Sequence, residues 1–135
     1  MIPNRSARLM LAVCLIGCSK TRSPVSVSQE FIDRYYIERD HAKALEVAEA
    51  GAAERIRSEK KLLEEGGTGG YSGVQPRVFY NLEKQQPIGD QTELTYRLTV
   101  DSSGVELKKR VRIIVKKVGT GYKVIFFDER DLPRK

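Results

Sequence analysis

The sequence predicts an α+β domain, with N-terminal helices packed on an antiparallel sheet of about four strands, after a cleaved signal peptide. Two observations predict the domain. Apolar residues recur at three- and four-residue spacing up to residue 65, as on one face of a helix, and they alternate with polar residues from 78 to 127, as in half-buried strands. A third observation, a charged start and a short apolar run that ends at Cys18, predicts the signal peptide. We expect residues 24–135 to form a single domain.

Residues 1–17 have the layout of a secretory signal peptide. Arg5 and Arg8 precede an unbroken apolar run from Leu9 to Ile16, and Gly17 follows. Eight apolar residues are far short of the roughly 20 that a helix needs to cross a bilayer. The run has no polar face and is followed by a linker-like stretch, which argues against a buried helix. We therefore expect this segment to be removed.

The end of the apolar run resembles the lipobox of bacterial lipoproteins. Leu15, Ile16, Gly17 and Cys18 match its order of Leu, a small or branched residue, Gly or Ala, and Cys. The resemblance implies that the Cys18 thiol receives a diacylglycerol, that the chain is cut just before it, and that the new amino end is acylated. A thiolate is nucleophilic enough for this transfer. The alternative is an ordinary cleaved signal in which Cys18 is incidental.

Lipidation would make the lipid bilayer, reached through acylated Cys18, the first partner of the protein in the bacterial cell envelope. Residues 18–23 would then be a tether that reaches at most about 18 Å when extended. Two or three acyl chains anchor a protein firmly, since each buried CH₂ contributes about 0.8 kcal/mol. In the lipoprotein sorting rule, Ser19 favours the outer membrane, on its periplasmic side.

The first half of the domain predicts helices. The Ser-Pro pair at 23–24 is typical of an N-cap and a first helical residue. An apolar face follows: Val27, Phe31, Ile32, Tyr35 and Tyr36. Asp40 is a good N-cap for a second helix, in which we expect four residues to pack: Ala44, Leu45, Val47 and Ala48. We expect Gly51 to interrupt that helix, which resumes over 52–65 until the glycines of 66–70 end it.

The second half predicts an antiparallel meander. The inward positions of its first three strands are apolar: Val78, Tyr80 and Leu82; Leu94, Tyr96, Leu98 and Val100; Leu107, Val111, Ile113 and Val115. Tight turns at 101–104 and 119–121 separate the later strands. The last strand, over 122–127, is apolar on both faces, so we expect it to be covered on both sides or to pair with another chain.

Helices followed by a long-stranded meander resemble the cone-shaped nuclear-transport-factor-like (cystatin-like) α+β superfamily, and within it small uncharacterised bacterial lipoproteins. Three parts carry the likeness: SPVSVSQEFIDRYYIERDHAKALEVA at 23–48, TELTYRLTV followed by RVRIIVKK, and GYKVIFFDE at 121–129. The resemblance implies a helix across a curved sheet and a pocket at the wide end of the cone. Some members are enzymes of the isomerase or dehydratase kind, and others only bind. The shared motifs are packing motifs, so they indicate fold rather than chemistry.

Five inward-facing residues are candidates for lining that pocket: Phe31, Tyr35, Tyr80, Tyr96 and Leu98. We expect Tyr35 and Tyr96 to face each other between helix and sheet. No acid or histidine shares their phase, so we assign no catalytic residue. His41, the only histidine, is expected to be exposed at the start of the second helix. One histidine and scattered acids predict no metal site, and we expect no cofactor.

The basic stretch KKRVRIIVKK at 108–117 is the strongest surface feature of a chain with a net charge of +6. Four of its residues share the outward phase: Lys108, Arg110, Arg112 and Lys116. We favour the interpretation that this stretch is a solvated sheet face whose charges discourage edge pairing. The alternative is contact with phospholipid head groups, lipopolysaccharide phosphates or an acidic protein. We expect no nucleic-acid partner, because the protein is expected to be exported and no aromatic residues interleave on this face.

These expectations describe a membrane-anchored envelope lipoprotein that serves as a non-catalytic ligand- or partner-binding module. Two alternatives stay open: an enzyme of the isomerase or dehydratase kind that uses the cone pocket, and an inhibitor or immunity-type protein. A titratable group deep in a cavity would favour the enzyme, whereas a filled core with an exposed apolar patch would favour a protein partner.

Overall fold

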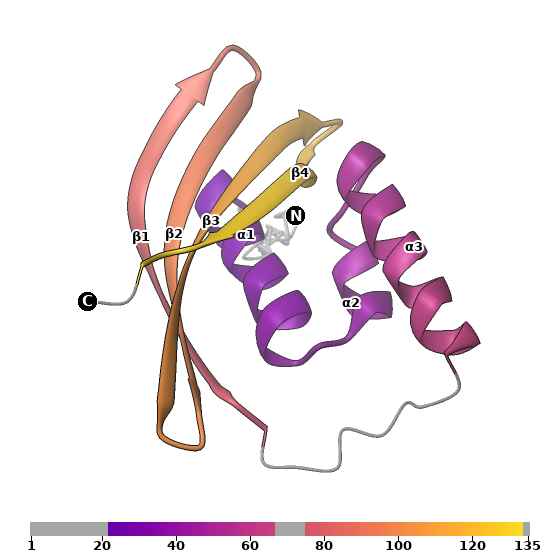
Figure 1. Cartoon of the computed structure of the whole chain (residues 1–135). Helices are drawn as coiled ribbons and strands as arrows, with labels where there is room; N and C mark the ends of the chain where they lie inside the picture. The colour runs from indigo at the N-terminus through magenta and orange to yellow at the C-terminus, as the bar shows by residue number, and fades with distance from the viewer. Residues whose placement is uncertain (1–21, 67–74, 134–135) are drawn as a thin grey trace, which may run out of the picture.

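A computed structural model describes residues 22–66 and 75–133 of the chain, as helices on one face of a curved sheet (Figure 1). The predicted signal peptide, Cys18 and most of the tether lie outside the described residues, as does the glycine-rich stretch over 67–74. Within the described part, no helix is long and apolar enough to span a membrane.

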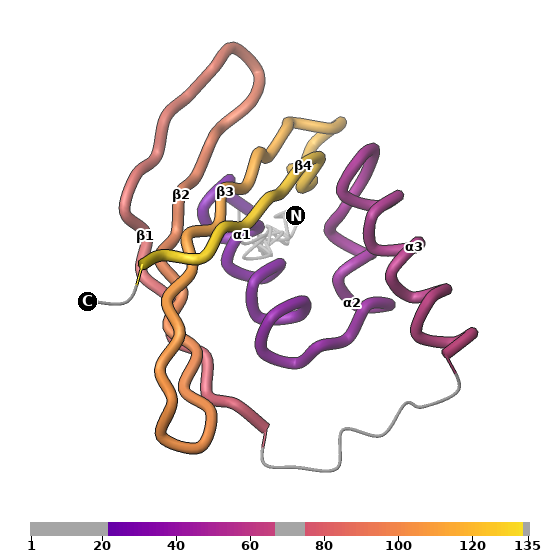
Figure 2. Tube along the Cα trace, in the orientation of Figure 1, coloured from indigo at the N-terminus to yellow at the C-terminus, as the bar shows by residue number. Residues whose placement is uncertain are grey.

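The sheet is a four-stranded antiparallel meander in the order β1-β2-β3-β4. Its strands are β1 (Arg77–Ile88), β2 (Gln91–Ser102), β3 (Val105–Val118) and β4 (Gly121–Asp131). The register shifts between Leu82 and Lys84 in β1, and between Ile114 and Val115 in β3 against β4. Such bulges bend and twist strands, and the sheet curves around the helices (Figure 2). The prediction of helices packed on a curved antiparallel sheet of four strands is confirmed.

The first helical segment joins an α-helix, α1 (Pro24–Ile32), to a π-helical turn, η1 (Asp33–Ile37). Ser23 is the N-cap, as its sequence predicts: its side chain accepts from the amide of Ser26 at 3.1 Å, and the Ser26 side chain accepts from the amide of Ser23 at 2.8 Å. At the other end, the amide of Glu38 donates to the carbonyl of Asp33 at 2.8 Å, which is the wider π-type spacing.

The second predicted helix is shorter than expected, which corrects the placement of Val47 and Ala48. Helix α2 covers only His41–Leu45, and α3 covers Ala50–Glu65. Between them a turn at 46–47 leads to Ala48, which pairs in parallel with Val124 of β4: the Glu49 amide donates to the Val124 carbonyl at 2.9 Å, and the Val124 amide donates to the Val47 carbonyl at 2.8 Å. These bonds satisfy part of the open edge of β4. The helix therefore breaks before Gly51, which lies within α3.

The core lies between the helices and the sheet. Inward residues of β2 and β3 are fully buried, as their alternation predicts: Leu94, Tyr96, Leu98, Val111, Ile113 and Val115. Val27, Phe31 and Ile32 of α1 pack against them. Two residues predicted to face the core are instead exposed, Leu82 by 39% and Leu107 by 38%. Leu82 lies on the edge strand, and Leu107 lies in a hairpin that extends past the helices (Figure 1).

Candidate functional site

The five predicted pocket residues lie in the layer between helices and sheet. Phe31, Tyr96 and Leu98 have no exposed surface, and Tyr35 and Tyr80 are partly buried against the same core. Three of the five predicted pocket residues are therefore out of contact with solvent.

Tyr96 and Tyr80 connect the sheet to the first helical segment. The hydroxyl of Tyr96 shares a hydrogen bond of 2.5 Å with Ser28, whose own hydroxyl donates to the carbonyl of Val25 at 2.8 Å. The hydroxyl of Tyr80 donates to the Asp33 carboxylate at 3.0 Å. Burial, and after it the bond to Asp33, raises the pKa of Tyr80 to about 12. Both hydroxyls thus act as neutral structural donors near neutral pH.

Tyr35 and Tyr96 do not face each other, contrary to the expectation. The ring of Tyr35 stacks on Phe31 at a centroid distance of 5.4 Å and meets the edge of Phe127 at 5.0 Å, whereas the ring of Tyr96 meets Tyr80 at 5.9 Å. Tyr35 lies in the π-helical turn η1 and packs against β4 through Phe127.

A polar cluster surrounds the Tyr35 hydroxyl. It was not predicted from the sequence. This hydroxyl donates to Glu59 of α3 at 2.5 Å. The same carboxylate meets the Arg55 side chain at 3.1 Å and the His41 side chain at 3.4 Å. His41 is only 19% exposed, so its predicted exposure is wrong: α3 packs beside the start of α2 and covers it. The i, i+4 spacing of Arg55 and Glu59 was the available signal in the sequence.

Arg55 extends this cluster to β4. Its guanidinium lies 4.2 Å from the Phe127 ring centroid, donates to the Phe127 carbonyl at 3.1 Å, and lies 4.0 Å from the Glu129 carboxylate. Since Glu59 already has three polar neighbours, its carboxylate is held as a structural acceptor rather than as a free base. The cluster ties three helical elements to the last strand.

The hydroxyl of Tyr36 differs from those of the other tyrosines between the helices and the sheet. It is buried near the Glu129 carboxylate but makes no hydrogen bond of good geometry with a described residue. Burial, and after it the charge of nearby Glu129, raises the pKa of Tyr36 well above its ordinary value. Tyr36 therefore stays neutral over the physiological range.

The four basic residues predicted on the outward phase of β3 lie on the outer face of the sheet, away from the helices. They are Lys108, Arg110, Arg112 and Lys116, and they alternate with buried Val111, Ile113 and Val115. Each has a carboxylate within 4.0 Å. The distances are 3.8 Å from Lys108 to Glu106, 3.3 Å from Arg110 to Glu83, 2.8 Å from Arg112 to Asp128, and 3.9 Å from Lys116 to Asp90.

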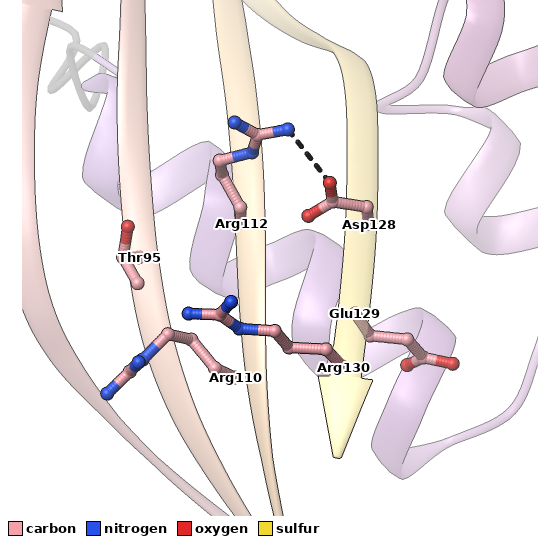
Figure 3. Close-up of a pocket in the computed structure, with 6 residues that line it drawn as sticks. All are labelled: Thr95, Arg110, Arg112, Asp128, Glu129 and Arg130. Carbon is pink, nitrogen blue, oxygen red and sulfur yellow. Dashed lines mark hydrogen bonds and ion pairs between the residues drawn. The ribbon is translucent and has the colours of Figure 1, made fainter. Parts of the chain in front are cut away.

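A depression of about 350 Å³ opens on this outer face (Figure 3). We call it the outer-face depression, and six residues line it: Thr95, Arg110, Arg112, Asp128, Glu129 and Arg130. In Figure 3 the side chains of Arg112 and Asp128 point toward one another, while the Glu129 carboxylate points away from the arginines. Arg130 was not among the predicted residues, because only strand pairing brings it beside β3. The geometry offers several guanidinium donors and one hydroxyl to an anion.

Comparison with known proteins identifies the fold. The sequence matches no family model and no curated protein. A solved structure of Rd1NTF2_05, in a form with five substitutions, superposes with a TM-score of 0.55 at 7% identity, over 76% of this chain and 91% of that chain. The chain has a nuclear-transport-factor-like α+β fold. A de novo designed protein with a curved β-sheet superposes with a TM-score of 0.42 at 14% identity, over 76% of this chain and 95% of that one.

The nuclear-transport-factor-like fold gives the two regions different surroundings. The polar cluster around Glu59 lies on the helix-covered side of the sheet, next to the core. The outer-face depression lies on the opposite side, open to solvent and bounded by three arginines together with Thr95, Asp128 and Glu129. Of the two regions, the depression is the one that a ligand can reach without rearrangement of the core.

Proposed function

We propose that the protein is a lipid-anchored lipoprotein of the bacterial cell envelope, and that it acts as a non-catalytic binding module for an anionic partner. The observation that carries the binding role is the group of three arginines around the outer-face depression. Guanidinium groups present planar, always-charged donors that match phosphate and carboxylate oxygens. On the helix side, by contrast, the core is packed and the oxygens of Glu59 are occupied.

The anchor is supported by the lipobox-like residues 15–18 and by the start of the fold. Ser23 is the N-cap of α1, so the folded domain begins five residues after Cys18. A fully extended segment of that length spans at most about 18 Å. A domain anchored at Cys18 would therefore work within reach of head groups, on the outer membrane and on its periplasmic side as Ser19 suggests. Basic residues near an anionic membrane each contribute about 1 kcal/mol of attraction.

The anchor is tested by labelling cells with a palmitate analogue and weighing the mature protein intact. We expect the wild-type chain to start at Cys18, to incorporate the label and to carry the mass of its acyl chains. Cys18→Ala should abolish both the labelling and this cleavage. The fold of the domain should be unaffected, because α1 begins at Pro24 and its cap needs only Ser23 and Ser26. An unmodified wild-type mass, or a mass that retains residues 1–17, would refute the anchor.

A further inference from the structure

One cross-strand row on the outer face consists of arginines. Arg97 of β2 lies directly opposite Arg110 of β3, and Arg110 lies directly opposite Arg130 of β4. We call these three residues the arginine row. The neighbouring row, two residues along each strand, holds Thr95, Arg112 and Asp128. Four guanidinium groups therefore occupy adjacent positions on three neighbouring strands.

Placing these charges side by side costs stability. Directly opposite residues of antiparallel strands have Cβ atoms about 4.5–5.5 Å apart, and like charges at such positions are destabilising. One carboxylate offsets two members of the row: Glu83, in the bulge of β1, lies 3.0 Å from Arg97 and 3.3 Å from Arg110. Asp128 is engaged by Arg112 at 2.8 Å.

The nearby carboxylates do not neutralise all of the arginine charges beside the outer-face depression. Among the described residues no carboxylate lies within ion-pair distance of Arg130, and the Nε atom of Arg110 is buried without a hydrogen-bond partner. Figure 3 shows the guanidinium of Arg130 extending across β3, over the floor between Arg112 and Arg110. A guanidinium without a carboxylate partner, beside a depression that two further arginines line, indicates a site for an anion, because uncompensated charge is otherwise selected against in a sheet.

We propose that the outer-face depression binds a phosphate group, with Arg130 as its principal ligand, Arg110 and Arg112 as further donors, and the Thr95 hydroxyl on its floor. A phosphate has more acceptor oxygens than a carboxylate, so it suits several guanidinium forks that approach from different strands. The phosphate group can belong to a lipid head group or to a free anion. The inference rests on the proposed function only in taking the partner to be anionic, since the site itself does not require the anchor.

The first arm of the test uses inorganic phosphate and the chain from residue 18 onward with Cys18→Ala. Phosphate is titrated while the arginine Nε–H signals are followed by NMR. We expect a saturable shift at Arg130, a weaker response to acetate, and an apparent affinity about tenfold lower in Arg130→Gln, the equivalent of losing one charge-assisted contact. The matched control is Lys116→Gln, which removes the same charge from the outer face but lies outside the depression, and it should stay within about twofold of wild type. Both positions are solvent-accessible, and the thermal midpoint of each variant verifies that it folds.

The second arm distinguishes the sources of phosphate with phosphatidylcholine vesicles that contain equal fractions of phosphatidic acid or phosphatidylglycerol. If Arg130→Gln weakens binding to phosphatidic acid more than binding to phosphatidylglycerol, the site recognises a lipid-borne phosphate. If vesicle binding is indifferent to Arg130 while free phosphate still binds, the ligand is a free phosphate. The proposal is overturned by a shift that does not saturate, by equal affinity for acetate, by equal losses in Arg130→Gln and Lys116→Gln, or by Arg130-dependent capture of polyglutamate without phosphate binding.

These outcomes are separate from those that test the proposed function. Phosphate binding at Arg130 in a protein that carries no lipid would retain the site and reject the anchor. An acylated protein whose binding to anionic vesicles ignores Arg130 and whose arginines do not respond to phosphate would retain the envelope binding module and reject this site.

Discussion

At the scale of single residues, the tyrosines between the helices and the sheet differ in what their hydroxyl groups meet. Those of Tyr35, Tyr80 and Tyr96 reach a carboxylate or a serine, whereas the hydroxyl of Tyr36 is buried without a partner among the described residues. A satisfied buried hydroxyl contributes about 1 kcal/mol, while an unsatisfied one loses its hydration for nothing in return. The same residue type thus has opposite energetic effects at neighbouring positions.

Replacing two of these tyrosines by phenylalanine should separate the two cases. Tyr96→Phe removes the bond to Ser28 and should lower the free energy of unfolding by about 1 kcal/mol. Tyr36→Phe removes only the unpaired hydroxyl, so it should leave that free energy unchanged or raise it by up to about 1 kcal/mol. Urea unfolding of both variants and wild type at pH 7 measures the difference. Equal losses in the two variants would show that the Tyr36 hydroxyl has a partner in solution.

At the scale of elements, the connection between α2 and α3 determines how the helices meet the sheet. Residues 47–49 pair with β4 at Val124, and the next residue, Ala50, has φ of +50°. A left-handed backbone suits glycine, because it places the Cβ atom of any other residue too close to its own backbone. The sheet pairing and the start of α3 together impose this conformation on an alanine.

Ala50→Gly should therefore stabilise the protein. The relief of the left-handed strain outweighs the flexibility that glycine adds to the unfolded chain, for a net gain of about 0.5–1 kcal/mol. Ala42→Gly is the matched control at an exposed position within α2, where φ is not positive and glycine should cost up to about 1 kcal/mol. Thermal and urea unfolding of the two variants should move in opposite directions. A loss at Ala50 would mean that the left-handed turn is absent in solution.

At the scale of the whole molecule, charge is divided between two sides. Residues 24–65, which form the helices, carry seven basic and ten acidic side chains, whereas residues 66–135 carry thirteen and eight. The helices cover one face of the sheet (Figure 1), and among the described residues the basic side chains of Lys108, Arg110, Arg112, Lys116 and Arg130 lie on the other face. Such a division orients a protein at an anionic surface, within the Debye length of about 8 Å at physiological salt.

Reversing charges on the two sides should affect membrane binding unequally. With the non-lipidated chain, Lys108→Glu/Lys116→Glu on the outer face should weaken binding to phosphatidylglycerol vesicles at low salt. Lys60→Glu/Lys61→Glu on α3 makes the same change in net charge and should weaken it less. Both double variants should change the free energy of unfolding by less than about 1 kcal/mol, because exposed ion pairs contribute little. Co-sedimentation with vesicles is the measurement, and equal losses would show attraction to net charge without orientation.

The features that the sequence predicted correctly are those that depend on neighbours in the chain. The start of α1 at Ser23 and Pro24 follows from local capping, and the burial of alternate residues in β2 and β3 follows from the pleat of a strand. The meander follows from strands joined by tight turns. Because side chains alternate between the two faces of a strand, the outward orientation of Lys108, Arg110, Arg112 and Lys116 could also be predicted from the sequence of β3.

Features that depend on contacts between distant segments could not be predicted in this way. The break at residues 47–49 exists because the edge of β4 supplies hydrogen bonds that compete with helical ones, and His41 is covered because α3 returns beside it. The arginine row requires a register: Arg97, Arg110 and Arg130 are far apart in sequence, and a shift of one residue in either strand pair would point one of them to the opposite face. Side-chain phase is a local property of the chain, whereas adjacency across strands is decided by pairing, and pairing is decided by the packing of the whole sheet against its helices.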